Sequence, residues 1–113
     1  MLFRSELVVS SAFRTHTDQR VLRERSLARF GDLEYDRVAV PGHSEHQLGT
    51  AVDFTSAEVL RASAARSFGS TRAYQWLTEH ANSFGFYLSY PEDKIQETGY
   101  IYEPWHWRYL GIK

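Results

Sequence analysis

The sequence contains no cysteine, which excludes disulfide frameworks and thiolate metal sites from this chain. No stretch approaches the run of about 18 apolar residues that a membrane-spanning helix requires, so we expect no such span. The first residues lack a basic segment followed by a long apolar run, and we therefore expect no signal peptide in this chain. Any metal bound here must use histidine and carboxylate ligands.

An excess of charge of one sign is also missing. Lysine and arginine together number 13, aspartate and glutamate 14, and the formal net charge is -1. This balance creates no strong field for nucleic acid or an anionic membrane, and we expect neither as a partner. The length of 113 residues and a hydrophobic content of 42% predict one globular domain over residues 1–113. Because no heptad repeat is visible, we expect a monomer.

Short apolar segments bounded by glycine, proline and polar residues predict several strands. These segments are residues 7–9, 51–54, 86–90 and 105–110. They do not alternate regularly with helical segments, as the strands of a parallel sheet would. The pattern therefore predicts an α+β fold, in which helices pack against a small antiparallel sheet.

Two segments have helical character. Residues 71–84 give the clearest pattern, because apolar or aromatic side chains recur at helical spacing in Ala73, Trp76, Leu77, His80, Ala81 and Phe84. Ser70 is the predicted N-cap of this helix and Gly85 its predicted end. Residues 18–30 contain good helix formers, and Thr17 is their predicted N-cap.

A histidine and an aspartate lie seven residues apart in the segment from Ser44 to Asp53. Gly49 between them allows the backbone to bend tightly, so that His46 and Asp53 can turn toward one point. Imidazole nitrogen and carboxylate oxygen are both good zinc ligands. The pair alone is also compatible with a polar loop and an incidental histidine. The neighbouring Glu45 is predicted to be a surface charge.

The segment from Glu103 to Tyr109 places a glutamate three residues before a histidine. Pro104 disfavours a helix across the pair, but Glu103 and His106 can converge if the chain turns at Pro104 and then runs extended. Trp105 and Trp107 alternate with His106, so that both indoles are predicted to face away from it in a strand. The alternative is an aromatic core strand that carries a hydrogen-bonded histidine.

Together these segments supply His46, Asp53 and His106 as metal ligands, with Glu103 as a fourth polar group. A catalytic zinc site uses three protein ligands and leaves a position for water, whereas a structural site uses four. The residues present fit the catalytic type, with Glu103 as the general base that accepts a proton from water. A purely structural metal domain is a weaker alternative, because it would need another protein ligand.

A third segment precedes the 18–30 helix. Arg14 follows a predicted strand and could bind a substrate carboxylate or a developing oxyanion through paired N–H donors. Gln19 at the start of the helix could hydrogen-bond a peptide group of a substrate. Both residues are also compatible with ordinary surface positions.

The three segments together resemble the VanY-type D-alanyl-D-alanine carboxypeptidases, which belong to the LAS group of zinc metallopeptidases. The family pattern S-x-H-x-x-G-x-A-x-D is met by Ser44, His46, Gly49, Ala51 and Asp53. The pattern E-P-W-H-W-R-Y is met in full by residues 103–109. The upstream pattern S-G-Y-R-S-x-x-x-Q is met by Ser11, Arg14 and Gln19, with Ala12, Phe13 and Thr15 as departures. The resemblance extends over residues 7–112.

The resemblance implies a LAS/hedgehog-like zinc peptidase fold and a Zn2+ cofactor held by His46, Asp53 and His106. It implies that Glu103 is the catalytic base and that Arg14 faces the substrate carbonyl or carboxylate. Ser44 would help to hold the terminal carboxylate of the substrate, and Gln19 would also contact the substrate. The implied substrates are peptidoglycan stem peptides that end in D-alanine. The implied location is therefore the cell envelope or the extracellular space.

Several activities remain compatible with this resemblance. L,D-carboxypeptidases, D,D-dipeptidases and endolysin-type endopeptidases share the metal core and differ in the loops that shape the cleft. A non-catalytic wall-binding or signalling module that retains zinc is an alternative outside the enzymes. Glu103 separates the two classes, because a binding module does not need a base beside the metal.

Overall fold

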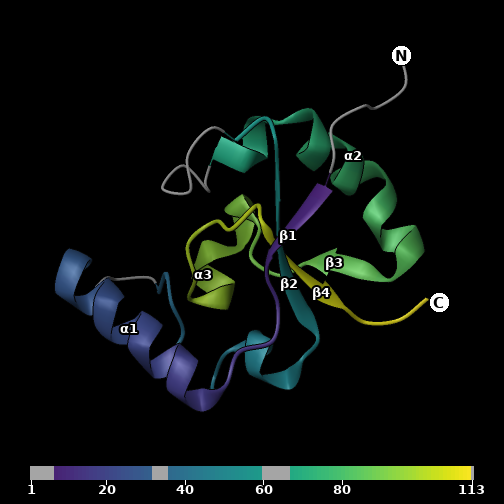
Figure 1. Cartoon of the computed structure of the whole chain (residues 1–113). Helices are drawn as coiled ribbons and strands as arrows, with labels where there is room; N and C mark the ends of the chain where they lie inside the picture. The colour runs from purple at the N-terminus through teal and green to yellow at the C-terminus, as the bar shows by residue number, and fades with distance from the viewer. Residues whose placement is uncertain (1–6, 32–35, 60–66, 113) are drawn as a thin grey trace.

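The computed structural model describes residues 7–31, 36–59 and 67–112 of the chain. The prediction of one domain over residues 1–113 includes residues outside these ranges, and it stays a prediction. The elements in chain order are β1 (Leu7–Ser11), α1 (His16–Phe30), η1 (Glu45–Leu48), β2 (Ala51–Ser56), α2 (Arg72–His80), η3 (Ala81–Phe84), β3 (Phe86–Leu88), η4 (Glu92–Lys94), α3 (Ile95–Thr98) and β4 (His106–Tyr109) (Figure 1).

The strands form one four-stranded sheet in the order β1-β2-β4-β3, and every pairing is antiparallel. The predicted α+β architecture with a small antiparallel sheet is therefore confirmed. The register places Asp53 of β2 between Ser11 of β1 and His106 of β4. Three segments that are far apart in the sequence thus meet at one position across the sheet.

The core lies on the face of the sheet that α2 covers. Its buried residues are Phe68, Ala73, Leu77, Ala81 and Trp107. Trp107 points into this core and its indole N–H donates to the Pro104 carbonyl at 2.9 Å. Since successive side chains of a strand point to opposite faces, His106 faces away from the core. In Figure 1, α1 and α2 lie on opposite sides of the sheet.

Both predicted helices are present, but their N-caps are corrected. Thr15 rather than Thr17 caps α1, through a capping box in which Asp18 N–H donates to Thr15 Oγ1 and Thr15 N–H donates to Asp18. Thr71 rather than Ser70 caps α2, because its Oγ1 accepts from Tyr74 N–H. The predicted stop at Gly85 is confirmed, although η3 forms the last turn before it.

The segment 36–39 connects α1 to the chain around Tyr100. Arg23 of α1 donates to the Asp36 carboxylate at 2.8 Å and to the Val38 carbonyl at 2.6 Å. The backbone N–H of Asp36 donates to the Gly99 carbonyl at 2.9 Å. These contacts build a wall beside the face of the sheet that carries His106. Among the described helices, none is long and apolar enough to cross a membrane.

Candidate metal centre and active site

Three side chains converge where β2 and β4 pair. Asp53 and His106 are direct cross-strand partners, so their side chains project from the same face. His46 comes from η1, which Ser44 caps by accepting the His46 N–H at 3.2 Å. Gly49 then turns the chain into β2 with φ of 74°, a conformation that suits glycine. The predicted turn between His46 and Asp53 is present.

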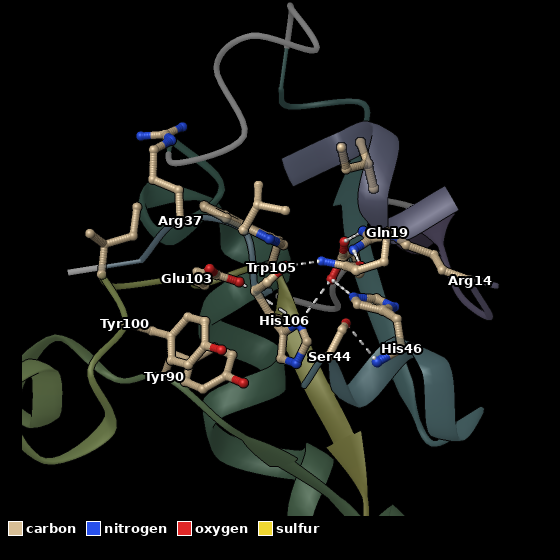
Figure 2. Close-up of a pocket in the computed structure, with 15 residues that line it drawn as sticks. Arg14, Gln19, Arg37, Ser44, His46, Tyr90, Tyr100, Glu103, Trp105 and His106 are labelled. Carbon is tan, nitrogen blue, oxygen red and sulfur yellow. Dashed lines mark hydrogen bonds and ion pairs between the residues drawn. The ribbon is translucent and has the colours of Figure 1, made fainter. Parts of the chain in front are cut away.

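The ligand atoms of His46, Asp53 and His106 all lie within 4.8 Å of one another, and all three residues are buried. Asp53 Oδ1 lies 3.0 Å from His46 Nε2 and 3.2 Å from His106 Nδ1. The two imidazole rings are nearly perpendicular, at 81°. Figure 2 shows Arg14, His46 and His106 directed toward a common centre.

The hydrogen bonds of the two rings define which nitrogens face that centre. His46 Nδ1 donates to the Ala12 carbonyl at 2.6 Å, since a carbonyl oxygen only accepts. His106 Nε2 donates to the Glu45 carboxylate at 2.8 Å. In the neutral rings, the opposite nitrogens therefore present lone pairs to Asp53 Oδ1. Three lone pairs at one point require a cation, and two nitrogens with one oxygen suit zinc.

Protonation of His106 offers one such cation in the metal-free protein. Burial lowers the pKa of His106, but hydrogen bonds to Asp53 and Glu45 outweigh burial and raise it to about 9. Burial likewise raises the pKa of Asp53, whereas hydrogen bonds with His106 and His46 lower it to about 2. A metal ion would compete with a proton for Nδ1 of His106.

Glu103 is held beside the ligands by the predicted turn at Pro104. His106 N–H donates to the Glu103 carbonyl at 3.0 Å, which closes the turn and brings the two side chains together. Glu103 Oε1 lies 3.8 Å from His106 Nδ1, and the residue is buried. Burial raises the pKa of the Glu103 carboxyl to about 8. A cation at the centre would favour its ionised form.

Arg14 and Gln19 line the same pocket and are partly engaged by the protein. Arg14 Nη2 donates to Asp53 Oδ2 at 3.0 Å, and its Nε donates to Ser11 at 3.1 Å. Gln19 is buried, and its amide donates to the Ala39 carbonyl at 2.8 Å. The structure thus places both residues at the site, and gives each a role in positioning its neighbours.

Apolar and aromatic side chains form another part of the pocket wall. They are Leu22, Val38, Tyr90, Tyr100, Ile101 and Trp105. The prediction that Trp105 faces away from His106 in a strand is wrong, because β4 begins at His106 and Trp105 belongs to the turn. Tyr90 packs against the His106 ring at 4.9 Å and stacks on Tyr100 (Figure 2). The wall can contact the aliphatic parts of a bound molecule.

The prediction of a surface charge at Glu45 is also wrong. Its side chain is only 17% exposed and contacts His106, Ser89 and Arg108. Burial raises the pKa of Glu45, but hydrogen bonds from His106 and Ser89 lower it to about 2. Its position next to a predicted ligand was the available signal in the sequence.

Comparison with known proteins agrees with this geometry. A model of the VanY D-alanyl-D-alanine carboxypeptidase family matches residues 3–112. The chain belongs to this family. It is 39% identical to a D-alanyl-D-alanine carboxypeptidase of Enterococcus faecalis, covering 94% of this chain and 41% of that protein. It is 38% identical to the putative carboxypeptidase YodJ of Bacillus subtilis, covering 96% of this chain and 40% of that protein.

Solved structures of VanY-type proteins share the fold. VanYB in complex with D-alanine-D-alanine superposes with a TM-score of 0.76 at 35% identity, covering 96% of this chain and 61% of that one. The LD-carboxypeptidase LdcB superposes with a TM-score of 0.79 at 37% identity, covering 96% of this chain and 51% of LdcB. A VanY D,D-pentapeptidase mutant in complex with Zn(II) superposes with a TM-score of 0.76 at 35% identity, covering 96% of this chain and 62% of that one. The expected LAS-type peptidase fold is therefore confirmed, although this VanY-family chain spans only about 40% of the curated relatives' length.

Proposed function

We propose that this VanY-family chain is a zinc-dependent D,D-carboxypeptidase that releases the terminal D-alanine from peptidoglycan stem peptides. The observation that carries the proposal is the meeting of His46, Asp53 and His106 beside the buried carboxylate of Glu103. Substrates of this kind place the protein's site of action in the cell envelope or outside the cell.

Zinc is the metal that the donors and the relatives support. The VanY D,D-pentapeptidase related to this chain has been solved with Zn(II), and VanYB with D-alanine-D-alanine. His46 Nε2, His106 Nδ1 and Asp53 Oδ1 would hold the ion, and three protein ligands leave room for water and substrate. Bound zinc would polarise the scissile carbonyl and lower the pKa of the attacking water to about 7.

Glu103 would serve as the proton carrier. In its ionised form it accepts the proton of the attacking water, and it then donates that proton to the amine of the departing D-alanine. Its burial suits this task, because burial raises its affinity for a proton, while a cation at the centre would favour the ionised form that accepts the proton from water. A metal-binding module without catalysis would have no use for such a buried carboxylate beside its ligands.

Arg14, Ser44 and Gln19 would bind the substrate from one side of the pocket. Arg14 presents a guanidinium that suits a carboxylate or a developing oxyanion. Ser44 accepts a hydrogen bond from His46 N–H, and a hydroxyl that accepts one bond can also donate one to a substrate carboxylate. Gln19 supports Arg14, whose Nη1 donates to its Oε1 at 3.4 Å.

An L,D-carboxypeptidase is the second candidate. The likeness to the LD-carboxypeptidase LdcB, at 37% identity and a TM-score of 0.79, is as strong as the likeness to VanYB. The two activities share metal and base and differ in the residue that precedes the scissile bond. Endolysin-type cleavage within the same wall peptides is a further alternative, and the chain is proposed to act as a monomer in each case.

The decisive experiment measures D-alanine release by the zinc-loaded protein. A stem pentapeptide ending in D-Ala-D-Ala and a stem tetrapeptide ending in a single D-Ala are supplied separately. Release from the pentapeptide supports the proposal, and release only from the tetrapeptide supports the L,D activity. Internal cleavage, detected by mass spectrometry, would indicate an endopeptidase.

Glu103→Gln tests the base within the same assay. It should retain stoichiometric zinc and lose at least about 100-fold in rate, the usual lower limit for removing a general base. Glu97→Gln, at a carboxylate that is 72% exposed on α3, is the matched control and should keep full activity. Wild-type turnover by Glu103→Gln would remove Glu103 from the mechanism.

A further inference from the structure

Glu45 has no role in the mechanism above, yet its carboxylate is held by three side chains. Oε1 accepts from Ser89 Oγ at 2.7 Å and from His106 Nε2 at 2.8 Å. Oε2 accepts from Arg108 Nη1 at 2.9 Å. One partner follows directly after β3 and two belong to β4, and they lie 44 to 63 residues away in the sequence. The carboxylate is therefore fixed in place by the tertiary fold.

The hydrogen bond between Glu45 and His106 determines which nitrogen of the neutral His106 ring carries the proton. A carboxylate paired with Arg108 accepts hydrogen bonds, so His106 must carry its proton on Nε2. In the neutral ring that a metal ion requires, the lone pair then lies on Nδ1, the nitrogen that faces Asp53 at 3.2 Å. Without the Glu45 oxygen, the proton could reside on Nδ1 instead, and the ring would present an N–H to the metal centre.

The other neighbours of the His106 ring do not hold its proton on Nε2. Tyr90 packs against the face of His106 at 4.9 Å and restricts its rotation, but a ring face does not select a tautomer. Asp53 and Glu103 lie on the Nδ1 side, at 3.2 Å and 3.8 Å. Within the described residues, Glu45 alone is recorded as bonding the Nε2 side.

The placement of Glu45 also couples the two histidines. Glu45 and His46 are consecutive in η1, and His106 and Arg108 lie on the same face of β4, two residues apart. One short helical turn thus supplies one ligand directly and the hydrogen-bond acceptor of the other. A shift of η1 would therefore move His46 and would also displace the hydrogen-bond acceptor of His106.

We propose that Glu45 is a positioning residue, which orients His106 and holds its proton on Nε2 so that Nδ1 faces the metal. The inference rests on the proposed function, since it assumes that His106 binds zinc. Carboxylates that orient metal-binding histidines typically contribute about 10- to 100-fold to metal affinity. Glu45 has the contacts that this role requires.

The test compares zinc affinity by competition with a chromophoric chelator. Glu45→Ala should bind zinc about 10- to 100-fold more weakly than the wild type. Glu45→Gln should retain more of the affinity, because its amide oxygen can still accept from His106 Nε2. Glu58→Ala is the matched control. Glu58 follows β2, is also half-buried and pairs with an arginine, Arg72, but its carboxylate accepts hydrogen bonds at the start of α2, outside the candidate metal centre. This substitution should lower stability and leave zinc affinity unchanged.

A spectroscopic readout separates positioning from a merely structural role and needs no variant. In the zinc-loaded wild type, long-range proton–nitrogen correlation spectra should show His106 protonated on Nε2 and metal-bound through Nδ1. Zinc bound through His106 Nε2, or wild-type affinity in Glu45→Ala, would overturn this inference alone. A wild-type chain that binds no zinc would overturn the proposed function as well, so the two failures are distinguishable.

Discussion

Arg14 donates a hydrogen bond to Oδ2 of Asp53 at 3.0 Å, while Oδ1 of the same carboxylate faces His46 and His106. The guanidinium therefore occupies one oxygen of Asp53 and leaves the other for the metal centre. The Arg14 side chain remains 19% exposed and lines the pocket. Arg14 is thus placed to orient Asp53, a predicted ligand, and we propose that it also contacts the substrate.

Arg14→Ala should lower kcat/KM for D-alanine release by about 100-fold or more, as removal of an oxyanion donor does in other hydrolases. The assay is run at saturating zinc, so that any weaker metal binding is compensated. Arg20→Ala, on the exposed side of α1, is the control and should behave as the wild type. Unchanged kinetics in Arg14→Ala would show that Arg14 has only a structural role.

Gln19→Ala should destabilise the fold, whatever Gln19 contributes to substrate binding. The substitution leaves the Ala39 carbonyl without its 2.8 Å donor in a buried position, at a cost of about 1–3 kcal/mol. Urea unfolding measures the change. Gln75→Ala, at an exposed position of α2, is the matched control. Equal stability of the Gln19 and Gln75 variants would show that the buried hydrogen bond contributes little.

The grouping of His46, Asp53, His106 and Glu103 could be predicted by combining two segments and the family patterns that they match, although each segment alone left an alternative open. The turn at Pro104 follows from a proline that disfavours a helix, and it places Glu103 beside His106 as expected. The spacing of His46 and Asp53 around Gly49 likewise indicated that these two side chains could turn toward one point, as they do. The corrected cap at Thr15 also had a local signal, since Asp18 lies three residues later in a capping box.

Contacts between distant segments could not be predicted in the same way. Glu45 and His106 are 61 residues apart, and only the pairing of β2 with β4 brings them together. Gln19 lies on a helix with little amphipathic pattern, so its burial depends on segment 36–39 packing against α1. Side chains of this kind acquire their roles from the tertiary fold.

The metal-free protein should lose stability as the pH rises. The pKa of His106 is raised from 6.5 to about 9, so its stabilising contribution is complete below pH 6.5 and is lost as the pH rises through about 9. The pKa of Glu103 is raised from 4.5 to about 8, because the fold favours its protonated form. Its contribution to the free energy of unfolding is therefore also lost as the pH rises through about 8. Urea unfolding with a chelator present, across this range, measures the effect.

Two comparisons make the pH experiment specific. His106→Asn should show a weaker decline, because it removes one of the two groups responsible. Saturating zinc should also flatten the profile, since a metal-bound imidazole no longer gains or loses that proton. Metal-free protein that becomes more stable over the same rise in pH would contradict the electrostatic account of the pocket.

The meeting of His46, Asp53 and His106 at one zinc ion is tested most directly by anomalous diffraction from zinc-loaded crystals on both sides of the zinc absorption edge. The structure predicts one strong peak about 2.0–2.2 Å from His46 Nε2, Asp53 Oδ1 and His106 Nδ1. A peak bonded to other residues, or no ordered peak despite stoichiometric zinc, would contradict it.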